Sequence, residues 1–255
     1  VSPEDDVEVR RIALTNHGTR IRELDVTSYA EMVLTSAVTD LAHPAFGKLF
    51  VETEYLPDCG ALLCHRRPRD SGDAAPSAFH VLSLEGRQQS PLEWETDRAR
   101  FLGRGRSTAN PVALDGRPLS GTTGVVLDPI VSLRQRVRLS PGATVRLSFS
   151  TGVAADRETV AALARKYHEA SATARTFAMA MAHTESGLRH LGISADDAVL
   201  FERLASVATA SSAASRSMAS TDAAWRAVTS SAAAWRAAIS HISRCPWTQE
   251  VTRKR

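Results

Sequence analysis

The sequence predicts a mainly β fold, an antiparallel sandwich that is followed by helices. The first observation is a series of short apolar runs, separated by turn residues, which extends through residues 1–154 and is typical of an antiparallel sandwich. The second is a change near Asp156, where apolar residues begin to recur at helical spacing. The third is an abrupt rise in Ala and Ser beyond residue 206. We therefore divide the chain into a β domain (1–154), helices (155–206) and an Ala/Ser-rich, aberrant or disordered tail (207–255).

The first half of the β domain contains an opening strand, a bent strand and a hairpin. Apolar residues alternate between Val7 and Leu14, and the turn at 16–18 ends this strand. The run from Ile21 to Leu34 predicts one long or bent strand, after which His43-Pro44 breaks the chain. Two apolar runs, 49–55 and 61–64, flank a turn and have the spacing of a hairpin.

The second half of the β domain contains further short strands and one long loop. Residues 68–77 are a polar loop, 79–82 a strand, and Trp94 and Phe101-Leu102 mark the next one or two strands. Residues 103–124 are rich in Gly and form an irregular excursion of a kind that is often functional. The runs 125–127, 130–137 and 145–149 predict the remaining strands, with a turn at Pro141-Gly142 before the last.

The helical region begins at Asp156, which is a suitable N-cap. A first helix is expected over 159–170 and a second over about 172–190, which Gly192 stops. A third helix starts at Ser194, since Ser194 and Asp197 form a capping pattern. The faces expected to be buried are Val160, Leu163, Ala164 and Tyr167 on the first helix, and Val199, Leu200 and Leu204 on the third.

The Ala/Ser-rich tail allows two interpretations. The sequence Ala-Ala-Trp-Arg-Ala occurs at 223–227 and again at 233–237. One interpretation is a weakly helical segment of low complexity. The other is out-of-frame translation of a GC-rich gene from about Ser206 onward.

Composition and charge exclude several classes of protein. The formal net charge is only +3, and the basic residues are spread among acids, so no nucleic-acid partner is expected. Neither a membrane-spanning run nor a secretory signal is visible. Three cysteines, an odd and small number, fit a reducing compartment, and we expect a cytoplasmic protein without a metal site or another cofactor.

The segment 100–111 is the most unusual part of the chain. Gly103 and Gly105 permit close approach of a ligand, and Arg104 and Arg106 offer forked donors to sugar hydroxyls or an anion. Asn110 adds an amide. The glycine pattern matches neither a Walker loop nor a dinucleotide fingerprint. A solvated basic turn is the alternative, and no self-contained catalytic set is visible, so we assign no catalytic residue.

Five longer strings of the sequence are distinctive in combination. They are LTNHGTRIRELDVTSYAEMVL (14–34), HPAFGKLFVETEY (43–55), RFLGRGRSTANPVAL (100–114), DPIVSLRQRVRLSPG (128–142) and the helical segment 167–206. Together these strings resemble glycoside hydrolase family 94, in particular its modules of the cyclic β-1,2-glucan synthase and cellobiose phosphorylase type. The resemblance covers about residues 5–206 and stops where the composition changes.

The resemblance implies a supersandwich, similar to galactose mutarotase, and a carbohydrate-binding role for residues 1–154. It implies that 155–206 are linker helices toward an (α/α)6 barrel, which this chain lacks and which would hold the catalytic acid. The chain would then be a fragment of an enzyme that transfers or phosphorolyses β-linked glucans. Its partners would be a β-glucan or oligosaccharide, with inorganic phosphate and a second copy of the chain in the parent enzyme. A parent enzyme of the synthase type would be associated with the inner membrane.

Within that interpretation, Arg104, Arg106 and Asn110 are the residues expected to reach toward sugar. The alternative is a stand-alone carbohydrate-binding or purely structural sandwich. A sandwich over residues 5–153 can fold alone, but a truncated sheet would leave an exposed edge and make the chain prone to aggregation.

Overall fold

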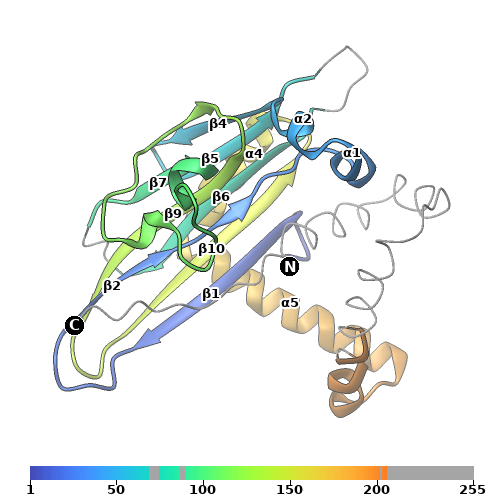
Figure 1. Ribbon diagram of the computed structural model, residues 1–255. Helices are drawn as coiled ribbons and strands as arrows, with labels where there is room; N and C mark the ends of the chain where they lie inside the picture. Colours follow the sequence, from blue (N-terminus) through green and yellow to red (C-terminus); the bar gives the residue numbers. More distant parts are fainter. Residues whose placement is uncertain (69–74, 87–89, 202, 206–255) are drawn as a thin grey trace.

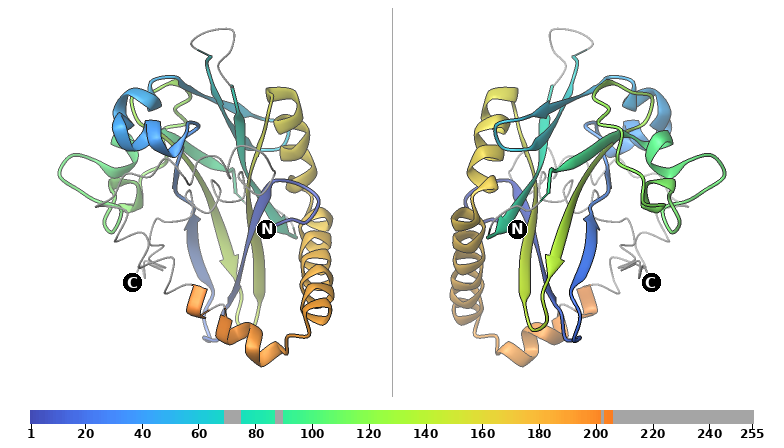
Figure 2. Two further views of the ribbon diagram at one scale, coloured as in Figure 1. Left: turned by 90° about the vertical axis from the view of Figure 1, so that its right-hand side faces the viewer. Right: turned by 90° about the vertical axis from the view of Figure 1, so that its left-hand side faces the viewer.

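The computed structural model describes residues 1–68, 75–86, 90–201 and 203–205. Two antiparallel sheets pack face to face, helices cover the outer face of one sheet, and a long loop covers the other (Figures 1 and 2). This confirms the predicted fold class. The division into domains stays a prediction.

The larger sheet contains both ends of the β domain. Its strand order in the described residues is β1 (Val7–Thr15), β10 (Thr144–Ala154), β6 (Ser77–Glu85), β5 (Ala61–Arg66), β4 (Val51–Leu56) and β8 (Gly124–Val125). The hairpin predicted from the turn at 57–60 is therefore present as β4 and β5.

The smaller sheet is built around β9 (Pro129–Leu139). Its other strands, β2 (Arg22–Thr27), β3 (Ala30–Glu31) and β7 (Glu93–Asp97), all pair with β9. The long strand predicted over 21–34 is thus bent into β2 and β3. The bend lies at Ser28, whose hydroxyl accepts a hydrogen bond from the Leu133 amide at 3.0 Å.

Three apolar layers hold the fold together. The main core lies between the sheets and includes Met32, Leu62 and Leu133, all with no exposed surface. A second layer lies between the larger sheet and α4 (Arg157–His168). A third lies between the smaller sheet and the long loop.

Strand β1 contributes to two of these layers. Val7 and Val9 face α4, whereas Ile12 and Leu14 face the other sheet. Successive side chains of a strand point to opposite faces, so odd-numbered and even-numbered residues serve different cores. This explains why the alternation in the sequence changes phase between Val9 and Ile12.

Helix α4 follows the prediction closely. Asp156 caps it by accepting a hydrogen bond from the Thr159 amide at 2.8 Å. Val160, Ala164 and Tyr167 are fully buried, and Leu163 is partly buried against the same cluster. Helix α5 (Ala170–Leu191) follows and ends at Gly192, which has a left-handed conformation with φ of 65°.

Three features of the local structure differ from what the sequence predicts. The predicted strand at Phe101-Leu102 is helix α3 (Arg98–Leu102), because Asp97 caps it through the Ala99 amide. The segment after residue 35 forms two unpredicted short helices, α1 (Ala37–Ala42) and α2 (Pro44–Lys48). The strand predicted at 125–127 is only Gly124–Val125.

The third helix is present over 195–201 and 203–205, but its apolar face is not buried. Val199, Leu200 and Leu204 are 50%, 53% and 56% exposed, because no described segment packs over them. Figure 2 shows this segment crossing below the sandwich, beyond the end of α5. The predicted tail, 207–255, lies outside the described residues, and so does Cys245.

Candidate functional site

The glycine-rich loop forms a layer of its own on the outer face of the smaller sheet. It leaves α3 at Gly103, passes through one short 3-10 turn, η1 (Val112–Leu114), and ends at β8. Beneath it lies a small apolar cluster in which the rings of Tyr29 and Phe101 are 4.9 Å apart. The loop therefore rests on a packed surface.

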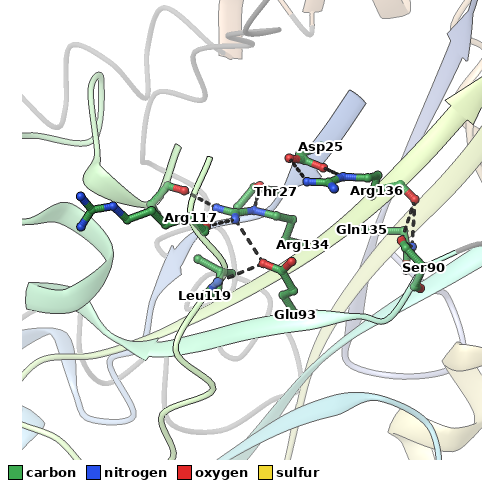
Figure 3. A network of polar contacts seen from close by, with 10 residues as sticks. Asp25, Thr27, Ser90, Glu93, Arg117, Leu119, Arg134, Gln135 and Arg136 are labelled. Atoms are coloured by element: carbon green, nitrogen blue, oxygen red, sulfur yellow. Dashed lines mark hydrogen bonds and ion pairs between the residues drawn. The ribbon is translucent and has the colours of Figure 1, made fainter. Parts of the chain in front are cut away.

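Arg134 of β9 fixes the second half of the loop (Figure 3). Its side chain is only 4% exposed and donates to the carbonyls of Ala113 and Arg117, the latter at 2.8 Å. It also donates to Glu93 Oε2 at 3.2 Å and to Thr27 Oγ1 at 3.1 Å. One planar guanidinium thus binds the loop, β7 and β2 together.

Two glutamates of β7 hold the next residues of the loop. Glu93 Oε2 accepts a hydrogen bond from the Leu119 amide at 2.9 Å. Glu95 is buried, and its carboxylate accepts from the Ser120 hydroxyl and from the Thr96 amide. The second half of the loop is consequently anchored along its length.

The three residues expected to contact sugar lie in the outer half of this loop. Arg104, Arg106 and Asn110 are all exposed, on one stretch of chain. Gly103 has φ of 82°, and a Cβ there would lie 2.9 Å from Val112 Cβ, so only Gly permits the tight turn at the loop's base. All three side chains are thus on the surface, and their contact with sugar stays a prediction.

Arg106 is partly engaged within the loop itself. It donates to Asp115 Oδ1 at 2.8 Å, and this hydrogen bond lowers the pKa of the Asp115 carboxyl. Asp115 is therefore ionised at neutral pH and cannot supply a proton to a leaving group. The chain offers Arg104 and Arg106 as donors and Asp115 as an acceptor at this surface.

The sequence reasoning missed the residues that support the loop, above all Arg134, Glu93 and Glu95. A signal for them exists in the alternation of β9 and β7. Val131, Leu133 and Val137 face the core, so Arg134 has to lie on the opposite face. Nothing in the sequence, however, tells which carbonyls that side chain meets.

A second charged cluster braces the end of the same sheet. Lys48 contacts Asp128 at 2.6 Å and Glu31 at 3.5 Å, and Arg98 donates to Glu31 at 2.8 Å. Burial raises the pKa of Glu31, but the hydrogen bonds from Arg98 and Tyr29 and the charge of Lys48 lower it by more. With two acids and two bases in contact, the cluster is suited to holding α2 and α3 against the sheet.

The buried thiols do not form a reactive site. Burial raises the pKa of Cys59 to about 11 and that of Cys64 to about 12. Within the described residues no group of three His, Cys, Asp or Glu side chains could hold a metal ion. No described helix is both long enough and apolar enough to cross a membrane.

Comparison with known proteins places this geometry in a family. The model of the glycosyl hydrolase 94 supersandwich domain matches residues 1–170. The chain is similar to the cyclic beta-(1,2)-glucan synthase NdvB of Rhizobium meliloti (strain 1021), with 38% identity over 205 residues, or 80% of the chain. It is also similar to a solabiose phosphorylase of Paenibacillus borealis, with 26% identity over 166 residues, or 65% of the chain.

These relatives are much longer than the matched part. The alignment spans 7% of the glucan synthase and 20% of the phosphorylase. The similarity therefore concerns only a small part of each relative.

Proposed function

The chain belongs to the glycosyl hydrolase 94 family, and from this we propose that it supplies a non-catalytic, carbohydrate-binding supersandwich to a larger carbohydrate-active enzyme. That enzyme acts on β-linked glucans by glycosyl transfer or phosphorolysis. The name of the glucan synthase supports the substrate and its synthesis, and the name of the phosphorylase supports phosphorolysis. Its partners are a β-glucan or oligosaccharide and inorganic phosphate, and it works in the cytoplasm, with homodimer formation by the parent enzyme as a further part of the proposal.

The observation that supports this proposal most is the anchoring of the exposed loop. Arg134, Glu93 and Glu95 fix residues 113–120, so the outer half with Arg104 and Arg106 is presented on a rigid base. Presenting polar groups in a fixed arrangement lowers the entropy cost of binding a polyhydroxylated ligand.

A non-catalytic role agrees with the chemistry of the loop. Hydrolysis or phosphorolysis of a glycoside needs a carboxylic acid that is protonated in the resting site. Asp115 is the loop's carboxyl beside the proposed sugar contacts, and Arg106 keeps it ionised. The loop therefore positions sugar, and the proton comes from elsewhere in the parent enzyme.

The proposal is tested on the full chain, labelled with nitrogen-15 and titrated with linear β-1,2-linked glucose oligosaccharides. We expect amide shifts within 103–115, and we expect the double substitution Arg104→Ala with Arg106→Ala to weaken that binding at least fivefold. The control is Arg20→Ala with Arg138→Ala, two exposed arginines at the other end of the smaller sheet. Unchanged spectra of the loop at millimolar sugar would contradict the proposed contact.

A stand-alone binding or structural module is the competing function, and the gene distinguishes it from a domain of a larger enzyme. A sequencing read from upstream of the Val1 codon through the codons for 207–255 supports the proposal if it reveals a helical barrel domain in any continuous or shifted frame. A read that shows no such domain favours the stand-alone module.

A further inference from the structure

An open groove of about 620 Å³ lies at the end of the sandwich where β4 turns into β5. It is distinct from the loop described above, because none of its lining residues belongs to 103–123. Its size falls within the range of small-molecule sites, about 300–1,000 Å³.

The groove exists because β6 is longer than its neighbour. The described pairing between β5 and β6 ends at Leu62 and His80, and β5 itself begins at Ala61. Leu82 and Leu84 of β6 therefore extend beyond β5. The turn at 57–60 and the junction of α4 with α5 frame the space beside them.

The floor of the groove is apolar and aromatic. Leu82, Leu84 and Leu92 line it together with Tyr55. The Tyr55 ring stacks on Trp94, with 3.7 Å between ring centroids and 5° between planes, so the tyrosine cannot swing aside. Such a surface suits the C–H face of a sugar ring.

A buried amide is fixed at the inner end. Gln135 is 1% exposed, and its Nε2 donates to Ser90 Oγ at 2.7 Å and to the Arg136 carbonyl at 3.0 Å (Figure 3). Every other inward-facing residue of this part of β9 is apolar, as Leu133 and Val137 show. A further hydrogen bond from Nε2 to the Ser90 carbonyl at 3.2 Å completes its contacts, so Gln135 fixes the shape of the inner end of the groove.

The outer rim consists mainly of hydrogen-bond acceptors. His168 Nδ1 lies 3.1 Å from the Leu82 carbonyl and donates to it, so Nε2 is the ring nitrogen left to accept from a ligand. Glu169 is exposed, and its carboxylate does not cap α5. Within the described part of the chain it has no hydrogen bond or ion pair. Asp58 adds a second carboxylate, which Arg165 contacts at 2.6 Å.

We propose that this groove is a second saccharide site, which takes a short neutral oligosaccharide with its ring faces on Tyr55 and its hydroxyls donating to Glu169 and His168. The sugar class rests on the proposed function, whereas the position of the site does not. An anionic ligand is disfavoured because the rim carries two carboxylates against one arginine. The site holds glucan away from the loop, so a single chain can be retained at two points.

The test uses the full chain and sophorose, a β-1,2-linked glucose disaccharide, with amide shifts recorded at Gly60, Gly86 and Ala170. We expect Ala170→Phe, which fills the groove, to weaken this binding at least tenfold, and Glu169→Gln to weaken it about threefold. Ala174→Phe is the matched control, because Ala174 lies one turn further along α5 and is exposed. Equal melting temperatures of the variants show that the fold is kept.

The outcomes separate this site from the loop. Shifts at the groove that survive Arg104→Ala with Arg106→Ala and disappear with Ala170→Phe support the groove. Shifts confined to 103–115 overturn it and leave the proposed function intact, whereas shifts confined to the groove overturn only the loop assignment. Binding of glucosamine without any binding of sophorose also overturns the proposal, since it identifies a cation site.

Discussion

Arg134 and His80 are two buried polar side chains, and each offsets the free-energy cost of its burial in a different way. A buried charge needs partners on all its donors, and Arg134 meets two carbonyls, one hydroxyl and the Glu93 carboxylate. His80 stays neutral instead. Its Nε2 lies 2.8 Å from Ser28 Oγ and its Nδ1 2.8 Å from Thr151 Oγ1, which gives a neutral imidazole one donor and one acceptor contact.

The neutrality of His80 predicts a pH dependence of stability. Burial, with a smaller contribution from Arg10, lowers the pKa of His80 to about 3 from its ordinary value of 6.5. Between these values the unfolded chain binds a proton that the folded chain excludes. The free energy of unfolding therefore falls by up to about 1.4 kcal/mol per pH unit as the pH drops from 6.5 toward 3.

Urea unfolding at a series of pH values measures this slope. His80→Gln keeps two polar contacts but has no titrating group, so we expect it to flatten the slope in that range. His17→Gln, at an exposed imidazole, is the control. An unchanged slope in His80→Gln would show that other groups dominate the acid sensitivity.

Elements whose signal is local were predictable from the sequence, and elements that depend on tertiary contact were not. The hairpin of β4 and β5 and helix α4 carry their own turn and cap residues, and both are where the sequence places them. The strand predicted at Phe101-Leu102 was wrong, because two consecutive apolar residues fit a strand as well as the last turn of a helix. The Asp97 cap and their joint burial against Ile130 distinguish the two. The candidate loop was found by its glycines, but its anchors on β7 and β9 depend on pairing across the sheet.

Strand β10 depends on one glycine for its packing. Gly152 pairs with Val7 on one side and with Phe79 on the other. A Cβ at this position would lie 2.5 Å from Phe79 Cε1 and 2.7 Å from Val7 Cγ2, which is closer than such atoms can approach. We expect Gly152→Ala to lower the free energy of unfolding by about 1–3 kcal/mol.

The matched control is Gly187→Ala, for which the expected change in the free energy of unfolding has the opposite sign. Gly187 lies within α5, and a Cβ there meets nothing within 4 Å. Gly187→Ala is therefore expected to raise the free energy of unfolding by roughly 0.5–1 kcal/mol through helix propensity. Thermal or urea unfolding measures both, and a neutral Gly152→Ala would mean that the sheet yields at this point.

At the scale of the whole molecule, the described chain consists of the layered β-sandwich and a helical arm that does not pack on it. The arm comprises the second half of α5 and the helix at 195–201 and 203–205. Thr176 is the last buried residue of α5, and Met181 is already 65% exposed. The arm continues with apolar side chains that are at least half exposed, namely Leu191, Val199, Leu200, Phe201 and Leu204. So many exposed large apolar side chains in one short segment are unusual for a monomer.

We expect the isolated chain to self-associate through this arm. The triple variant Val199→Lys, Leu200→Lys and Phe201→Lys should shift the mass measured by light scattering toward the monomer at the same concentration. The control places Lys at Ser171, Ala174 and Ala178, which are exposed in the first half of α5. A wild-type chain that stays monomeric at high concentration would contradict the prediction.

The pairing of β1 with β10 also determines when the fold can close on the ribosome. Thr15 and Thr144, which share a hydrogen bond at the end of this ladder, are 129 residues apart. At a translation rate of about 5–20 residues per second, β1 waits roughly 6–26 s for its partner. During that interval neither of the apolar layers in which β1 takes part can form around its side chains, namely Val7, Val9, Ile12 and Leu14. The apolar side chains of β1 are therefore exposed to chaperones throughout that interval.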